Sequence, residues 1–318
     1  MANKSVSFIF FLLLFIVGNL QAQKVEEIFM DTDMGSMPEG IAIDQNKGHI
    51  YMSSIRLDKV YKCEINGQNC IDVISSGQEG FTFGTGMMIV KNHLFVCGRF
   101  ERAKKPMVLQ IDLATNNIEN VFKLPDSTKA TFNDLTVDEN WNVYMTDSDF
   151  SRIYRLDHKT GEISVFLEDV QIKGPNGICI SDDQSKLYLS STTFGIRIVD
   201  IATKKILNPI HDATIGKGID GLKYYKNKLL VVYNYGGKEK EKQGLVEFAL
   251  SENGAEILHG KDLTIGHTRN NIPTTVGMYK GHAYYLANSQ FDNYNWGENT
   301  VRRPGDLVKT ALLKVKID

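Results

Sequence analysis

Short apolar strands alternate with polar turns along almost the whole chain, and one unit recurs. Each copy begins with a polar or small residue, continues as a brief apolar alternation, and passes a polar turn. It ends in a second apolar run that closes on Ser, Thr, Asn or Gly. A clear copy joins residues 176–181, which read NGICIS, to residues 187–191, which read LYLSS. Such short runs bounded by turn formers are typical of β-strands.

The spacing of these units predicts the architecture. Their first residues fall at positions 39, 85, 133, 176, 220 and 274, which gives steps of 43 to 54 residues. A period of about 40 to 50 residues built of short strands is the signature of a β-propeller blade. Two outer strands follow each pair, and no stretch reads as a long amphipathic helix. We therefore predict an all-β, six-bladed β-propeller with four-stranded blades, closed by pairing residues 25–29 with residues 312–317.

The N-terminus differs from the repeats. Lys4 precedes an apolar run from Phe8 to Val17, and the small residue Ala22 closes the segment. This order is typical of a secretory signal peptide, and the run is too short to span a bilayer. We predict a signal peptide over residues 1–22 and a single propeller domain over residues 23–318, secreted or periplasmic, with no membrane span after cleavage. An uncleaved membrane anchor is the alternative.

Charge and motifs narrow the partners. The chain has 36 Lys and Arg residues against 38 Asp and Glu residues, for a formal net charge of -2. This balance gives no field strong enough to capture nucleic acid or anionic lipid, so we expect a small-molecule substrate and no nucleic acid. The sequence leaves the oligomeric state unknown. It lacks the G-x-S-x-G, H-E-x-x-H, P-loop and G-x-G-x-x-G motifs, which disfavours serine hydrolases, zincins and nucleotide enzymes.

The four cysteines are too few for a disulfide scaffold. Cys63 and Cys70 flank a segment centred on the Asn-Gly pair at 66–67, which favours a two-residue type I′ hairpin turn. Such a turn would set the two cysteines opposite each other, within reach of a disulfide. Two free thiols are an equal alternative. Cys97 and Cys179 fall inside apolar strand patterns and are predicted to be buried packing residues.

The repeat also places candidate ligands. Because the first strand of a propeller blade lines the central channel, residues at one repeat position gather at one height around the axis. Here these residues are Glu39, Thr85, Asn133, Asn176, Asp220 and Thr274. Four of them carry carboxylate or amide oxygens, which suit Ca²⁺, and two carboxylates balance its charge. The alternative is that Asn and Asp only make the turn into each strand, which does not account for Glu39.

Four motifs at these positions read PEG at 38–40, FND at 132–134, PNG at 175–177 and DG at 220–221. They resemble the motifs of the senescence-marker-protein/gluconolactonase/luciferin-regenerating-enzyme family of calcium-dependent six-bladed propellers. The likeness covers nearly the whole mature chain and extends to diisopropyl fluorophosphatase and the paraoxonases. It implies that the four oxygen donors at those motifs hold a catalytic calcium at the bottom of a pocket: Glu39, Asn133, Asn176 and Asp220.

The resemblance also implies a chemistry. A calcium-dependent hydrolase of lactones or related esters would use the metal to polarise the carbonyl and Asp220 as general base, and we place Asn133 with Asp220 among the catalytic residues. In the phosphotriesterase branch the same carboxylate attacks phosphorus, so phosphotriesters are a second substrate class. Thr131 stands where family members often carry an arginine that holds a sugar acid, so sugar-lactone specificity is not implied. A non-catalytic propeller that binds a ligand or partner, with a structural calcium, is the alternative.

Loops on the metal-bearing face supply further candidates for the substrate pocket. Thr85 and Thr274 complete the ring, and Arg99 follows the second strand of its blade. His211 and His267 precede ring positions in loops that should enter this face, and an ordinary loop histidine is the alternative for both. Further rim candidates follow the other second strands: Arg56, Asp147, Asn234 and Gln290.

Two other features complete the assignment of faces. The longest loop, residues 291–306, holds Tyr294 and Trp296 and is expected to form either a lid or a surface excursion. Histidines at the start of second strands are placed on the face opposite the metal: His49, His93 and His282.

Overall fold

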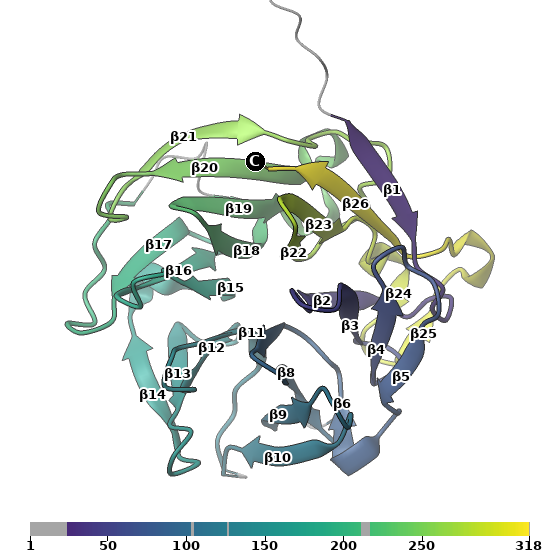
Figure 1. The fold of residues 1–318 in the computed structure, drawn as a ribbon, viewed down its shortest axis with the longest axis horizontal. Helices are drawn as coiled ribbons and strands as arrows, with labels where there is room; N and C mark the ends of the chain where they lie inside the picture. The colour runs from purple at the N-terminus through teal and green to yellow at the C-terminus, as the bar shows by residue number, and fades with distance from the viewer. Residues whose placement is uncertain (1–23, 103–104, 126, 211–216, 318) are drawn as a thin grey trace, which may run out of the picture.

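The computed structural model describes residues 24–102, 105–125, 127–210 and 217–317. Six small sheets stand as blades around a central axis, with their innermost strands facing it, as Figure 1 shows. The ring closes as predicted, because β1 (Val25–Phe29) pairs antiparallel with β26 (Ala311–Lys316) at the outer side of the last blade. The six-bladed propeller inferred from the repeat is confirmed.

The strands of each blade follow chain order from the axis outwards, except that β1 is the outermost strand of the last blade. The first two blades are β2 (Pro38–Ile43), β3 (His49–Ser54), β4 (Lys59–Glu64), β5 (Ile71–Ile74), then β7 (Met87–Val90), β8 (His93–Phe100), β9 (Pro106–Asp112), β10 (Ile118–Lys123), with β6 (Phe81–Thr82) paired to the end of β8. The third and fourth are β11 (Phe132–Val137), β12 (Val143–Asp147), β13 (Arg152–Leu156), β14 (Ile163–Glu168), then β15 (Pro175–Ile180), β16 (Lys186–Ser191), β17 (Gly195–Asp200).

The last two blades are β18 (Ile219–Tyr225), β19 (Lys228–Tyr233), β20 (Gly244–Leu250), β21 (Ile257–Asp262), then β22 (Val276–Tyr279), β23 (His282–Leu286), β26 and β1. A small hairpin, β24 (Tyr294–Asn295) and β25 (Thr300–Val301), interrupts the last blade. One-turn 3₁₀ segments lie at Gln78–Gly80, Val170–Ile172, Tyr235–Gly237, Lys240–Lys242, Phe291–Asn293 and Pro304–Asp306. In the part of the chain described here, no helix is long and apolar enough to cross a membrane.

The apolar core is divided among the junctions between neighbouring blades. In β8, Leu94 and Val96 pack toward the first blade, whereas Phe95 and Cys97 pack toward the third. All four side chains are fully buried, because both faces of the sheet are covered. This explains why second strands read as continuous apolar runs, each buried side chain contributing about 1.5–3 kcal/mol relative to exposure. The prediction that Cys97 and Cys179 are buried is also confirmed.

The fourth blade departs from the expected four strands. Among the described residues it has three, and an isolated bridge between Val199 and Ile206 marks where a fourth would lie. The side chain of Asn208 bonds the backbone of β17 instead, accepting from Ile198 N at 2.8 Å and donating to Ile196 O at 2.8 Å. An amide side chain thus satisfies the backbone groups that a fourth strand would pair.

Cys63 and Cys70 form a disulfide, which selects one of the two sequence-level alternatives. The predicted turn is wrong, however. Gly67 N donates to Glu64 O at 2.8 Å, so the turn spans 64–67, and Gly67 at its last position has a φ of 83° while Asn66 keeps a negative φ. The extra residues of the loop are absorbed near Asn69, so the register that opposes the two cysteines survives.

A closed ring of hydrogen bonds ties the six blades together at the predicted repeat position. The backbone carbonyl of each ring residue accepts a hydrogen bond from the preceding blade. The pairs are Thr274 Oγ1 to Glu39 O, 2.8 Å; Ser53 Oγ to Thr85 O, 2.7 Å; Gly86 N to Asn133 O, 2.7 Å; Thr146 Oγ1 to Asn176 O, 2.5 Å; Ser190 Oγ to Asp220 O, 2.7 Å; and Gly221 N to Thr274 O, 2.8 Å. Residues spread over the whole chain are therefore fixed at one height around the axis.

The first two blades lie so close together at the ring that the residue after Glu39 has no room for a side chain. A Cβ atom on Gly40 would lie 2.2 Å from the backbone oxygen of Thr85. We predict that Gly40→Ala lowers the free energy of unfolding by about 3 kcal/mol or more, since backbone must move to relieve the overlap. Gly305→Ala is the matched control, because nothing lies within 4 Å of its Cβ. Equal stability of the two variants in chemical denaturation would contradict the account.

Candidate active site

The four predicted ligands share one backbone feature, a one-residue bulge. In the first blade, Pro38 pairs with Ser54 but Ile41 pairs with Met52, so the register shifts by one residue around Glu39. The same shift occurs around Asn133, Asn176 and Asp220, in the β11/β12, β15/β16 and β18/β19 pairs. A bulge bends the strand and re-aims a side chain. The same β-bulge therefore orients the side chain of each of the four donors.

These four residues lie between two cavities on the axis. The larger cavity has a volume of about 800 Å³ and opens on the face that carries Arg99, while the smaller one beneath holds about 10 Å³. Both are lined by all four donors, so the donors form the partition between them: Glu39, Asn133, Asn176 and Asp220. The predicted ligand ring is therefore brought together at the base of a pocket.

Burial and repulsion between carboxylates disfavour the ionised forms of the two ring carboxyl groups, Glu39 and Asp220. Burial raises the pKa of Glu39 well above its usual range, and the nearby charges of Asp220 and Asp134 raise it further. Burial also raises the pKa of Asp220, against the opposing effect of hydrogen bonds from Asn176 and Asn234. Glu39 Oε2 is buried and has no hydrogen-bond partner among the described residues. The ring thus combines two buried carboxyl groups, one of which has an unsatisfied oxygen, with two amide side chains. This is the composition of a cation site.

Hydrogen bonds fix the orientation of Asp220. Asn234 Nδ2 donates to Asp220 Oδ2, and the Asn234 amide is itself oriented by Gly236 N, which donates to its Oδ1 at 2.9 Å. Asn234, a predicted rim residue, therefore lines the cavity and positions the carboxylate at its base. Bonds of this kind favour the ionised form of the carboxyl group.

A third carboxylate below the ring is compensated by the protein itself. Asp134 Oδ2 lies 3.4 Å from Lys223 Nζ and accepts Ile178 N at 3.1 Å. Sequence analysis missed this pair. Its signal is that Asp134 follows the ring residue where four other blades have glycine, and the facing Gly86 leaves the space that Asp134 fills. Glu39 and Asp220, by contrast, have no ion pair with any residue that the structure describes.

A second group of ligand-type side chains lies at the end of β8 opposite Arg99. His93 Nε2 is 3.0 Å from Glu119 Oε2 and 4.0 Å from Asp112 Oδ2, and the three ligand atoms lie within 4.8 Å of one another. The lining of the larger cavity includes none of the three. His93 thus lies away from the ring, on the face where its repeat offset places it.

The other pocket candidates are partly brought together. Thr85 and Arg99 line the larger cavity, and Thr274 lines the smaller one, with its hydroxyl bound to Glu39 O. His267 lies at neither cavity. His211 lies outside the described residues.

The placement of His267 in the pocket is therefore wrong. Its Nδ1 accepts Arg269 N at 3.3 Å, and its carbonyl accepts Asn270 N at 2.9 Å, so it shapes a local turn. Asn270 anchors this turn away from the axis, donating to Gln243 O at 2.7 Å. Counting residues along a repeat predicts height along the axis, but not the distance of a loop residue from it.

The long loop, residues 291–306, forms one side of the cavity. Phe291, Asp292 and Trp296 line the cavity, and Tyr294 is buried beneath them with its hydroxyl donating to Asn299 Oδ1 at 2.6 Å. Trp296 packs edge-on against Tyr294, with ring centroids 4.8 Å apart. The loop is a packed wall of the cavity.

Phe83 is a cavity residue that the sequence analysis missed. It adopts a left-handed φ of 55°, and its N–H donates to Asp58 Oδ1 at 2.9 Å. The signal was an aromatic residue directly before a glycine in the turn that enters the second blade. Two other rim candidates do not line the cavity. Arg56 Nε donates to Gly35 O, and the Gln290 amide exchanges hydrogen bonds with the backbone N–H and C=O of Val308.

Asp147 supports the cavity wall from behind. It is fully buried, and its Oδ1 accepts Thr131 N at 2.9 Å and Asp149 N at 3.2 Å. Burial raises the pKa of Asp147 to about 6, with the two N–H donors opposing and the charge of Asp149 adding to the rise. Thr131, which lines the cavity, is thus held by a carboxyl group that binds its proton more tightly in the folded state.

An acid whose pKa is raised by folding destabilises the fold as the pH increases. The folded state binds a proton at Asp147 between about pH 4 and pH 6 and the unfolded state does not, so stability falls over that window. We predict that Asp147→Asn is more stable than wild type by roughly 1–2 kcal/mol at pH 7.5, with the difference vanishing near pH 4. Urea denaturation at both pH values tests this, and a pH-independent difference would contradict it.

Comparison with known proteins places this geometry in context. Residues 37–238 match the family model described as the SMP-30/Gluconolactonase/LRE-like region. No curated protein matches the chain in sequence. A gluconolactonase from Xanthomonas campestris has a similar structure, at 14% identity and a TM-score of 0.65, over 93% of this chain and 90% of that one.

Two further solved structures share the fold. A luciferin-regenerating enzyme is 13% identical at a TM-score of 0.62, over 92% of this chain and 95% of that one. The calcium-binding protein regucalcin from Agrobacterium tumefaciens is 13% identical at a TM-score of 0.61, also over 92% and 95%. At these identities the structural likeness shows a common fold, whereas the family match rests on residues 37–238.

Proposed function

Since the chain belongs to the SMP-30/gluconolactonase/LRE-like family, we propose that it is a calcium-dependent hydrolase of lactones or related esters. One observation carries the proposal. At the base of a cavity of about 800 Å³, Glu39 and Asp220 lie beside two amide side chains and have no cationic partner among the described residues. Hard oxygen donors with two negative charges suit Ca²⁺.

The residues that would hold the calcium are Glu39, Asn133, Asn176 and Asp220. When bound, the ion supplies Lewis-acid polarisation of a carbonyl oxygen and offsets the repulsion between the carboxylates. The structural neighbour regucalcin is a calcium-binding protein, which supports this assignment. The unsatisfied Glu39 Oε2 supports it independently of any neighbour.

Asp220 is the proposed general base. A water molecule at the base of the cavity would transfer a proton to its carboxylate while the water oxygen attacks the acyl carbon. The bond between the acyl carbon and the alkoxy oxygen then breaks, and the proton is returned to the leaving oxygen. Asn234 and Asn176 hold the carboxylate in one orientation throughout, so little reorganisation is needed when the proton moves.

The walls of the cavity supply binding surface and exclude water. The lining includes four apolar or aromatic side chains, those of Phe83, Ile272, Phe291 and Trp296. A cavity with apolar walls and a few polar groups at one end is the usual form of a small-molecule site. We therefore propose a small-molecule substrate with an apolar part.

We further propose that the protein is exported. The disulfide between Cys63 and Cys70 supports this, because disulfides persist mainly in oxidising compartments. The proposal agrees with the signal peptide expected over residues 1–22.

Turnover of lactones and aryl esters by residues 23–318 tests the proposed function. We expect hydrolysis that chelation abolishes and added Ca²⁺ restores, and Asp220→Asn to lower kcat/KM by about 10²–10⁴-fold because the base is lost. Asp262→Asn, the same change on the exposed outermost strand of the same blade, should retain wild-type turnover.

Thermal unfolding provides a readout that does not depend on turnover. Calcium should raise the Tm of the wild-type protein and raise that of Asp220→Asn less, since a ligand stabilises the state that binds it. Wild-type protein that turns over no substrate yet keeps its calcium-dependent Tm would support the non-catalytic alternative. Activity and Tm that are both indifferent to chelation would contradict the metal assignment.

A further inference from the structure

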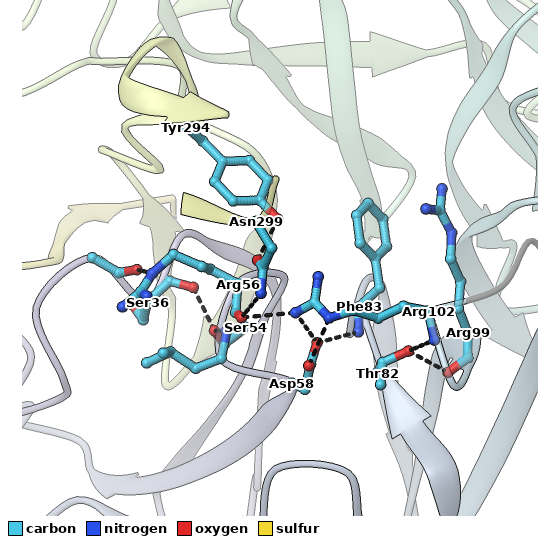
Figure 2. A network of polar contacts seen from close by, with 12 residues as sticks. Ser36, Ser54, Arg56, Asp58, Thr82, Phe83, Arg99, Arg102, Tyr294 and Asn299 are labelled. Carbon is cyan, nitrogen blue, oxygen red and sulfur yellow. Dashed lines mark hydrogen bonds and ion pairs between the residues drawn. The ribbon is translucent and has the colours of Figure 1, made fainter. Parts of the chain in front are cut away.

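Arg99 lies on the wall of the cavity, at the end of β8. Its guanidinium stacks over the ring of Phe83, with the guanidinium carbon 3.7 Å from the ring centroid, and the two side chains run side by side in Figure 2. Stacking occupies a face of the guanidinium and leaves the N–H groups at its edge available. Those N–H groups form a planar fork that matches a carboxylate.

Arg99 forms no ion pair with the part of the chain that the structure describes, and the attraction of Asp149 acts on it from beyond ion-pair distance. Its buried Nε has no hydrogen-bond partner among those residues. The neighbouring Arg102 behaves differently, because its Nε is 3.0 Å from Asp58 Oδ2 and its Nη2 is 2.6 Å from Asp58 Oδ1. A half-buried cation with an unsatisfied donor is costly unless a ligand completes it.

The backbone of Phe83, whose ring stacks against Arg99, is fixed by a hydrogen-bond network. Asp58, fixed by Arg102, accepts the Phe83 N–H, and Arg102 Nη2 also donates to Arg56 O at 2.8 Å. The long loop joins the same network, since Asn299 Nδ2 donates to Arg56 O at 3.2 Å. Figure 2 shows the hydrogen bonds that join Arg102 to Asp58 and Arg56. The residue on which Arg99 stacks is therefore held in place by several hydrogen bonds.

Aromatic side chains adjoin the cation on the cavity side. The rings of Phe83 and Trp296 are 6.0 Å apart, and those of Trp296 and Phe291 are 5.2 Å apart. Trp296 is 51% exposed, so it offers ring surface to a ligand. Lys217 also lines the cavity, but it is exposed at the rim, where water screens its charge. The cavity thus has a carboxylate base and, on one wall, a cation beside flat apolar surfaces.

We propose that Arg99 binds a carboxylate of the substrate, and that the preferred substrates are lactones or esters that carry a carboxylate on an aromatic or similarly flat ring. The ring lies against Phe83 and Trp296, and the fork of Arg99 receives the carboxylate. The scissile ester is then directed to the base of the cavity, where Glu39 and Asp220 lie. This inference rests on the proposed hydrolase function for its substrate class, but the binding of a carboxylate can be measured without turnover.

Direct binding is the first test. Calorimetry in the presence of Ca²⁺ should show that benzoate binds the wild-type protein about 10–100-fold more tightly than benzamide, as expected for charge-assisted hydrogen bonds. Arg99→Gln should remove this preference and Arg99→Lys should retain part of it, because the charge stays and the fork is lost. Arg303→Gln, an equal loss of charge on the long loop away from the cavity lining, should keep the preference.

Turnover of a matched ester pair is the second test. The anionic 4-acetoxybenzoate and its neutral methyl ester differ in the carboxylate alone. We expect wild-type kcat/KM to favour the anion, mainly through KM, and Arg99→Gln to lower the anion-to-neutral ratio by about 10–100-fold. The ratio cancels any general effect of the substitution on folding.

The outcomes separate the two proposals. Benzoate that binds no more tightly than benzamide, or a preference that survives Arg99→Gln, would overturn the role of Arg99 even if both esters are hydrolysed. A preference lost in Arg99→Gln together with no turnover of either ester or of any lactone would support the carboxylate site and overturn the hydrolase function. If Arg99→Gln loses the preference for benzoate and also shows the lowered anion-to-neutral ratio of kcat/KM, the full proposal is supported.

Discussion

The structure depends on the closed ring of hydrogen bonds in which each blade donates to the carbonyl of the next ring residue. Because the donors come from Ser, Thr or backbone N–H groups of the preceding blade, the six ring residues cannot move independently of one another. The bulge in four of the blades then turns a polar side chain toward the axis from this fixed level. A chain whose ring positions are 43 to 54 residues apart thereby assembles a site smaller than any single blade.

The same constraint explains why two carboxylates tolerate burial together. Many apolar side chains at the blade junctions contribute to the packing free energy. The unfavourable free energy of burying Glu39 and Asp220 arises at one place on the axis. Asp134 shows how the fold compensates a carboxylate when no ligand is intended, with Lys223 brought to 3.4 Å. Among the residues described here, the two ring carboxylates have no such partner. The site can therefore take up a cation.

Much of this arrangement could be predicted from the sequence, because a repeat of short strands fixes the number of blades and the height of equivalent residues. The closure by β1 and β26 and the gathering of Glu39, Asn133, Asn176 and Asp220 follow from that logic. The bulges could not be predicted, since they depend on how neighbouring strands pair. Nor could the place of His267, whose loop is held off the axis by Asn270, or the turn at 64–67, where Gly67 alone takes the positive φ. Local signals predicted each element, while contacts between blades decided its final geometry.

Calcium binding to the ring is the central claim, and a titration of the wild-type protein and Glu39→Gln by isothermal calorimetry tests it most directly. The substitution removes one charge at the buried, unpartnered Oε2 while keeping the size of the side chain. The His93, Asp112 and Glu119 group is unchanged in the variant, so any binding there cancels in the comparison. The account predicts that the wild-type protein binds one calcium ion that Glu39→Gln does not bind, or binds far more weakly. Equal calcium binding by the two proteins, or none by the wild type, would contradict it.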